Sequence, residues 1–329
     1  MPANLTHKYQ KAEEEYRRAQ SLEEQIACLE FMLQVIPKHK GTEKLQADLK
    51  SRLKEARAEQ HVEKASVKKG LSYRIPRQGA GTVVVIGGPN AGKTRVLAEL
   101  SNAAPEVAPY PFTTREPFPA MMPVNDVLIQ LIDTPPVTDA HFEPYINSFA
   151  RTADLVLLCM DGSSDDAPDD TLAVIRQLSA RKTLLDDTTA FDETDFSKLH
   201  VKTRLIITRA DDSDVDTRIE FLQELLPREI PTVRVEFDRD ESRESLRNAI
   251  FESLGVICVY TKAPGKRAVY EDPFTVPIGG TVEDLAMRVH QDLADKLKFA
   301  RIWGAEVHDG QSVGREHVLR DGDMLELHT

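Results

Sequence analysis

The sequence predicts an α/β protein in which a doubly wound parallel sheet follows a helical unit and precedes a small β-grasp domain. Residues 5–59 place apolar side chains at helical spacing and contain a single glycine. From residue 81, short runs of Val, Ile and Leu alternate with longer amphipathic stretches. After residue 258 the chain changes to short strand-like segments separated by Gly-Gly and Asp-Gly turns. Together these patterns predict three units.

Length and composition agree with this division. A chain of 329 residues can form two or three domains, and we place them at residues 1–70, 71–257 and 258–329. No apolar run has membrane-spanning length, and the first residues lack a secretory h-region. We therefore expect a cytoplasmic protein without a membrane partner. The three cysteines are far apart, which argues against a disulfide framework or a zinc site.

The central unit consists of strands and crossover helices. Continuous apolar runs suit strands buried on both faces of a parallel sheet, and the runs are "TVVVIGG", "DVLIQLID", "DLVLLCMD", "TRLIITRAD" and "PTVRVEF". The acidic, threonine-rich stretch from Leu184 to Lys198 interrupts this alternation. We interpret it as an inserted loop that faces solvent. In the last unit, a strand and a Gly-Gly turn precede one amphipathic helix, and further strands follow.

A phosphate-binding loop follows the first predicted strand. Gly87, Gly92, Lys93 and Thr94 have the spacing G-x-x-x-x-G-K-T between a strand and a helix. Glycines allow backbone N–H groups to surround a phosphate, and the helix N-terminus adds positive charge. Lys93 would contact the β- and γ-phosphates, and the Thr94 hydroxyl would bind magnesium. The other residues expected to contact the nucleotide here are Pro89, Asn90 and Ala91.

Two later aspartates select among the possible nucleotides. Asp133 ends the strand "LIQLID", where its carboxylate can hold magnesium. Asp211 ends "TRAD", where its two oxygens can accept the N1 and N2 hydrogens of guanine. Adenine lacks that donor pair. The sequence therefore favours guanine, with Thr208 and Arg209 in the same base-binding segment.

These motifs, in this order, resemble those of Obg-type GTPases. The matching segments are "GGPNAGKT", "YPFTTREP", "IDTPP" and "TRAD", and the tail from "VYTKAPGK" resembles the TGS domain of the developmentally regulated GTP-binding proteins. The resemblance implies GTP or GDP and Mg²⁺ as ligands. It implies that Thr113 or Thr114 lies in a mobile switch, where one hydroxyl would meet magnesium and the γ-phosphate. It thus gives Lys93 and these threonines catalytic roles.

The sequence departs from this pattern in three places. Pro136 stands where the family has a glycine whose N–H contacts the γ-phosphate, and proline has no such donor. Val137 stands where a glutamine orients the attacking water in Ras-like enzymes. Arg209 replaces a lysine, although its alkyl stem and its positive charge are retained. We therefore expect weak switching and slow hydrolysis.

Asn90 has two interpretations. In some GTPases that lack the glutamine, an asparagine at this position helps to bind a potassium ion, which would stabilise transition-state charge. Alternatively, the Asn90 amide stabilises the loop by bonding its own backbone.

The function predicted by analogy is a GTP-binding protein that hydrolyses GTP slowly and acts with the ribosome or structured RNA. The net charge of −12 opposes general nucleic-acid binding, but local basic stretches occur at "PKHKGTEK", "HVEKASVKKG" and "TKAPGKR". The alternative is a nucleotide-bound protein-interaction module with negligible turnover. A metabolic kinase is disfavoured by Asp211. The sequence leaves the oligomeric state open.

Overall fold

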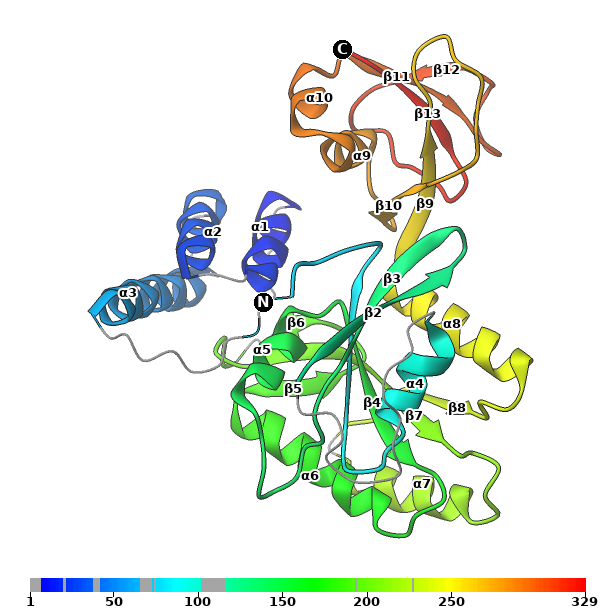
Figure 1. The fold of residues 1–329 in the computed structure, drawn as a ribbon. Coiled ribbons are helices and arrows are strands. Elements are labelled where there is room, and N and C mark those ends of the chain that lie inside the picture. Colours follow the sequence, from blue (N-terminus) through cyan, green and yellow to red (C-terminus); the bar gives the residue numbers. More distant parts are fainter. Residues whose placement is uncertain are drawn as a thin grey trace.

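The computed structural model describes residues 7–19, 22–37, 42–65, 73, 75–101, 116–192, 194–226 and 228–329. Figure 1 shows a helical unit beside the central sheet and a small domain at one end of that sheet. This arrangement confirms the predicted fold class. Within the described ranges, no helix is both long enough and apolar enough to cross a membrane.

Three helices form the N-terminal unit. Tyr9, Leu29, Met32 and Leu49 are almost completely buried between them. Burial of such side chains contributes roughly 1.5–3 kcal/mol each, so the helices depend on packing more than on intrinsic propensity. The helices are α1 (His7–Arg18), α2 (Leu22–Val35) and α3 (Glu43–Ala65).

The central sheet is parallel except for two strands, β2 and β6. Its strand order is β2-β3-β1-β4-β7-β5, β8 also pairs with β7, β2 runs antiparallel to β3, and the short β6 runs antiparallel to β7. The bounds are β1 (Thr82–Gly87), β2 (Phe118–Val124), β3 (Val127–Asp133), β4 (Leu155–Asp161), β5 (Thr183–Asp186), β6 (Ala190–Phe191), β7 (Leu199–Thr208) and β8 (Thr232–Val235).

Helices cover both faces of this sheet, which explains the continuous apolar runs. Along β1, Val83 and Val85 pack into one core cluster, whereas Val84 and Ile86 pack into the other. The first cluster includes α4 (Lys93–Leu100) and α8 (Asp240–Leu254). The second includes α5 (Pro144–Thr152), α6 (Ala167–Ala180) and α7 (Val215–Leu225).

The interpretation of the acidic stretch as a solvating loop was wrong in part. Part of it forms β5 and β6, and His200 on β7 bonds Asp186 at 2.8 Å and Asp192 at 3.1 Å. The ring centre of Phe191 lies 6.3 Å from that of Tyr16. The guanidinium of Arg52 stacks over the Phe191 ring. The stretch therefore contributes part of the surface against which the N-terminal helices pack.

The C-terminal domain is a β-grasp. Its sheet has the order β10-β9-β13-β11-β12, and β13 is parallel to β9. Gly279 has φ 82° in the predicted Gly-Gly turn, and Thr281 and Asp284 form a capping box at the start of the following helix. The elements are β9 (Val256–Thr261), β10 (Phe274–Pro277), α9 (Val282–Val289), α10 (Gln291–Lys296), β11 (Phe299–Trp303), β12 (Gln311–Val313) and β13 (Met324–His328).

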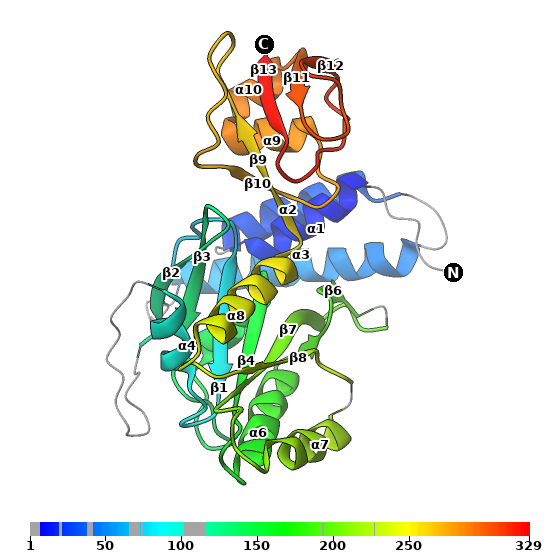
Figure 2. The ribbon, with the colours of Figure 1, turned by 90° about the vertical axis from the view of Figure 1, so that its right-hand side faces the viewer.

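Gly255 connects the β-grasp domain to the central sheet directly. It has φ 63° at the end of α8, and β9 begins at the next residue. Cys258 on β9 packs with the core of the central unit, and its thiol lies 3.8 Å from the carbonyl oxygen of Asn125 in the β2–β3 turn. Lys11 of α1 forms an ion pair with Asp284 of α9 at 3.0 Å. All three units therefore meet at the same end of the sheet (Figure 2).

Candidate nucleotide-binding site

The loop between β1 and α4 requires glycine at two positions. Gly92 has φ 83°, and a Cβ there would lie 2.9 Å from Thr208 Cγ2. A Cβ on Gly87 would lie 2.8 Å from the carbonyl oxygen of Cys159. Because both gaps are shorter than real Cβ contacts, neighbouring strands hold this loop close to the carboxyl edge of the sheet. Without side chains at these two glycines, the backbone of the loop can approach a phosphate closely.

Lys93 is the first residue of α4 and is 6% exposed. Its ammonium donates to the carbonyl oxygen of Gly88 at 2.7 Å. Burial lowers the pKa of Lys93, and the nearby Asp133 carboxylate opposes that shift. An additional anion beside the ammonium would favour its charged form. This environment suits a lysine that binds phosphate.

Thr94 and Asp133 meet beside Lys93. The Thr94 hydroxyl donates to Asp133 Oδ2 at 2.7 Å, and Asp133 is 1% exposed. A hydroxyl and a carboxylate are hard oxygen ligands of the kind that Mg²⁺ prefers. Their placement at the N-terminus of α4 fits a magnesium ion bound next to a phosphate. The structure thus brings together the loop glycines, Lys93, Thr94 and Asp133.

The segment from Thr208 to Asp211, which the sequence predicts to contact the base, adjoins the same loop. The Thr208 hydroxyl lies 3.2 Å from the carbonyl oxygen of Ala91, to which it donates. Arg209 has φ 50°, and its guanidinium forms an ion pair with Asp161 at the end of β4. Asp211 is exposed on the loop that follows β7. Its carboxylate is thereby accessible to a ligand at the carboxyl edge of the sheet.

The segment after Asp133 is packed into the protein. Pro136 is buried, and Val137 is fully buried in the core cluster that contains α5 and α6. The Val137 N–H donates to the carbonyl oxygen of Gly87 at 3.1 Å, and the Thr134 hydroxyl donates to the carbonyl oxygen of Val85 at 2.8 Å. Val137 therefore neither faces the solvent nor offers a group that could orient water.

Asn90 lies exposed at the tip of the loop with φ 57°. Asparagine tolerates this left-handed conformation better than most residues. Among the hydrogen bonds of the described residues, none involves the Asn90 side chain. The adjoining Pro89 is half-buried. The two interpretations of Asn90 thus differ in whether its amide turns toward an ion or toward the loop.

The sequence did not point to every residue near this site, and two residues that it did predict lie outside the described part of the chain. Thr113 and Thr114 lie outside the described residues. Asp161 was missed, although it ends a buried strand as Asp133 does. Arg218 was also missed, and it donates to the carbonyl oxygen of Gly162 at 2.6 Å and to Asp212 at 2.6 Å. No sequence pattern indicates that a helical arginine fixes two loops.

Comparisons with known proteins agree with this geometry. The model of a family described as 50S ribosome-binding GTPase matches residues 82–188, and that of the TGS domain matches residues 257–329. The chain combines a GTPase domain with a TGS domain. It is similar to the developmentally regulated GTP-binding proteins. The chain is thus similar to GTPases over residues 82–188 and to TGS domains over residues 257–329.

The relatives match over nearly their whole length. An uncharacterized GTP-binding protein of Methanocaldococcus jannaschii is 26% identical, with 93% of this chain and 92% of the relative covered. GTP-binding protein 1 of Schizosaccharomyces pombe is 25% identical, with 93% and 99% covered. Developmentally-regulated G-protein 2 of Arabidopsis thaliana is 24% identical, with 92% and 90% covered. The similarity therefore extends over all three units.

A solved structure supports the fold. The YchF GTPase of Schizosaccharomyces pombe superposes with a TM-score of 0.50 at 12% identity, covering 78% of this chain and 100% of that chain. At this identity the likeness concerns the fold alone.

Proposed function

We propose that the protein binds GTP and GDP with Mg²⁺, hydrolyses GTP slowly, and acts in the cytoplasm with the ribosome or structured RNA. The contact between Thr94 and Asp133 carries the nucleotide part of this proposal. It joins the helix that follows the loop to the strand next to β1, at the point where the phosphates and their metal would bind. The match of residues 82–188 to the GTPase family model supports guanine as the base.

Each residue of the site has a defined role in this proposal. The backbone from Gly87 to Gly92 surrounds the phosphates. Pro89 lies in this loop but has no N–H to donate, whereas Asn90 and Ala91 each have one. Lys93 neutralises the charge of the phosphates. Thr94 and Asp133 hold Mg²⁺, which would neutralise charge on the phosphate oxygens. Asp211 accepts the guanine N–H groups, while Arg209 lays its alkyl stem along the base. Thr208 positions this segment against the loop.

Hydrolysis is slow in this proposal because two usual contributions are missing. Pro136 has no N–H to donate to a γ-phosphate. Val137 is buried and apolar, so it cannot orient the attacking water. The remaining catalytic groups in this proposal are Lys93 and one of Thr113 and Thr114. The role of the threonines is proposed from the sequence. A potassium ion held by Asn90 would add positive charge next to the phosphates. It would stabilise the negative charge that develops there in the transition state.

The ribosome or RNA part rests on the TGS domain and on the basic stretches. One lysine of these stretches is a poor candidate for an RNA contact. Lys262 forms an ion pair with Glu326 at 2.9 Å and lies 4.0 Å from the centre of the Trp303 ring. Lys266 is exposed and better placed. Lys68 and Lys69 lie outside the described residues.

Co-sedimentation with ribosomes over a salt series tests this part. Contacts between lysines and phosphates release counterions, so association should weaken steeply with salt. A variant with Lys68, Lys69, Lys266 and Arg267 changed to Gln should lose most of the association while keeping its GTP affinity. The matched control changes Lys296 and Lys298 in the same domain. Absence of salt-sensitive association in either nucleotide state would contradict the ribosome or RNA proposal.

The burial of Pro136 and Val137 favours one alternative function. A protein in which the segment after Asp133 is packed in the core could serve as a nucleotide-bound interaction module with negligible turnover. Single-turnover phosphate release with GTP, in potassium and in sodium, separates the two. Measurable release supports slow hydrolysis, and none over many hours supports the module.

A further inference from the structure

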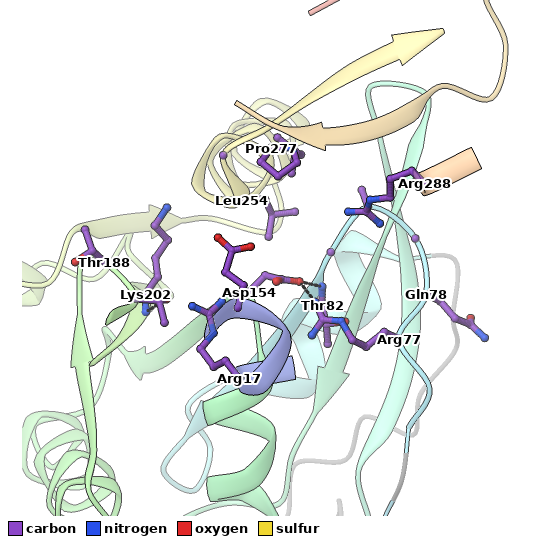
Figure 3. A pocket seen from close by; sticks show the side chains of 17 residues that line it. Arg17, Arg77, Gln78, Thr82, Asp154, Thr188, Lys202, Leu254, Pro277 and Arg288 are labelled. Atoms are coloured by element: carbon purple, nitrogen blue, oxygen red, sulfur yellow. Dashed lines mark hydrogen bonds and ion pairs between the residues drawn. The ribbon is translucent and has the colours of Figure 1, made fainter. Parts of the chain in front are cut away.

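A polar cavity of about 440 Å³ lies where the three units meet. Its walls include Arg17 of α1, Lys202 of β7, and Pro277 and Arg288 of the TGS domain. Gly81 and Thr82, at the start of β1, form part of its floor. The candidate nucleotide site follows Gly87 at the other end of β1, so the cavity is a separate place. Figure 3 shows the side chains that line the cavity.

Of the side chains that the structure describes, four basic ones line this cavity. They come from different parts of the chain, and they are Arg17, Arg77, Lys202 and Arg288. The two carboxylates in the lining are Glu14 and Asp154. Asp154 is already engaged, because it forms an ion pair with Arg77 and accepts the Thr82 N–H at 2.8 Å. Positive charge is thus gathered here in a chain whose net charge is −12.

Lys202 is a cation of this cavity whose hydrogen-bond acceptor is uncharged. Its ammonium donates to the carbonyl oxygen of Ser253 at 2.8 Å, which is a neutral acceptor. Burial lowers the pKa of Lys202, the positive charges of Arg204 and Arg17 lower it further, and Asp187 opposes them. An anion in the cavity would stabilise the charged ammonium. It would thereby offset both the desolvation cost and the repulsion between like charges.

The size and the composition of the cavity limit the ligand. A volume near 440 Å³ falls in the range of small-molecule sites, which is roughly 300–1,000 Å³. Nucleic-acid strands instead follow extended basic grooves with aromatic side chains on which bases stack. Among the described residues, those lining this cavity include no aromatic side chain. Guanidinium groups bind phosphate oxygens in pairs, which suits a ligand with several phosphate groups.

We propose that this cavity is a second anion site, which binds a small polyphosphate such as the phosphate chain of a nucleotide. Because its cations belong to α1, the central sheet and α9, a bound anion holds all three units together. The ion pair between Lys11 and Asp284, at 3.0 Å, already joins two of them. The site is independent of the phosphate loop.

Calorimetric titration of tripolyphosphate into the full-length protein tests this proposal. The protein is first saturated with GDP so that the phosphate loop is filled. We expect one equivalent of tripolyphosphate to bind, and Arg288→Glu to weaken the binding at least tenfold. Lys296→Glu, an exposed lysine in the same domain, is the matched control and should change it less than twofold. Arg17→Glu should act as Arg288→Glu does.

Two further measurements keep the result specific. GTP affinity of the Arg288→Glu protein should equal that of the wild type, which separates this site from the nucleotide site. Lys93→Ala should lose GTP binding and retain tripolyphosphate binding. The proposal is overturned if the wild type binds no tripolyphosphate, if Arg288→Glu and Arg17→Glu have no effect, or if Lys93→Ala abolishes the binding. Displacement of tripolyphosphate by duplex RNA would also overturn it in favour of a nucleic-acid surface.

Discussion

The Thr94 hydroxyl donates a hydrogen bond of 2.7 Å to Asp133 Oδ2. This contact joins the N-terminus of α4 to the carboxyl end of β3 through two residues that are 39 positions apart in sequence. Asp133 is 1% exposed, so its carboxylate is held in place by the protein and not by solvent. The proposed magnesium ligands are therefore pre-positioned.

Asp133→Asn should weaken GTP binding in the presence of Mg²⁺ by about 10- to 100-fold, because an amide oxygen attracts the ion less than a carboxylate does. The weakening should largely disappear when nucleotide affinity is measured in EDTA. Asp139→Asn is the matched control, since that side chain is exposed and pairs with Arg176. An equal loss with and without Mg²⁺ would show that Asp133 acts on the fold and not on the metal.

Pro136→Gly should restore the missing N–H and with it a difference between nucleotide states. The expected result is a larger contrast between GDP and GTP in protease cleavage around Thr113. Glycine also raises the entropy of the unfolded chain, which costs roughly 0.4–1 kcal/mol of stability. Pro264→Gly, at an exposed position of the TGS domain, controls for this general effect. If the contrast is unchanged, the switch explanation fails.

Potassium should raise GTP hydrolysis more than sodium does if Asn90 binds a monovalent ion. Asn90→Ala should then remove the difference between the two salts while leaving Mg²⁺-dependent GDP affinity nearly unchanged. Asn102→Ala, at a second asparagine outside the loop, serves as the control. Persistence of the potassium effect in the Asn90→Ala protein would exclude this side chain as the ligand.

The network around His200 should make the packing of the insertion dependent on pH. Hydrogen bonds from the Thr194 hydroxyl and from His200 lower the pKa of Asp192. A lowered folded-state pKa stabilises the protein above the unfolded value, near 3.9, and that contribution is lost as the pH falls through the folded value. Asp192→Asn should therefore lower the Tm at pH 7.

Repeating the melting experiment at successively lower pH tests the sign. The difference in Tm between wild type and Asp192→Asn should shrink as the pH falls below about 4. Asp309→Asn, an exposed aspartate of the TGS domain, should show no comparable trend. A difference that grows on acidification would contradict the assignment.

The sheet was predictable because local and global signals agree there. The apolar run from Val83 to Ile86 is continuous because alternate side chains enter two different core clusters. The loop after it was predictable because its glycines, Lys93 and Thr94 have fixed spacing between a strand and a helix. The same logic extends to Asp133 at the end of β3.

The insertion and the ion pair at the base segment could not be derived in this way. The acidic composition suggested a solvated loop. In the structure, however, Phe191 packs near Tyr16, which is remote in sequence, and His200 forms a hydrogen bond with Asp186. Asp161 is buried beside Arg209 only because β4 and β7 are neighbours, and strand order is a tertiary property. Composition does not encode such contacts.

Selectivity for guanine tests the account most directly. Calorimetric titration of GTP, ATP and xanthosine triphosphate with Mg²⁺, into wild type and Asp211→Asn, gives all the affinities needed. We expect the wild type to prefer GTP to ATP by at least 100-fold. Asp211→Asn should lose GTP affinity and gain affinity for xanthosine triphosphate, because the amide donates to the oxygen that xanthine carries in place of the amino group. Equal binding of GTP and ATP by the wild type would contradict the account.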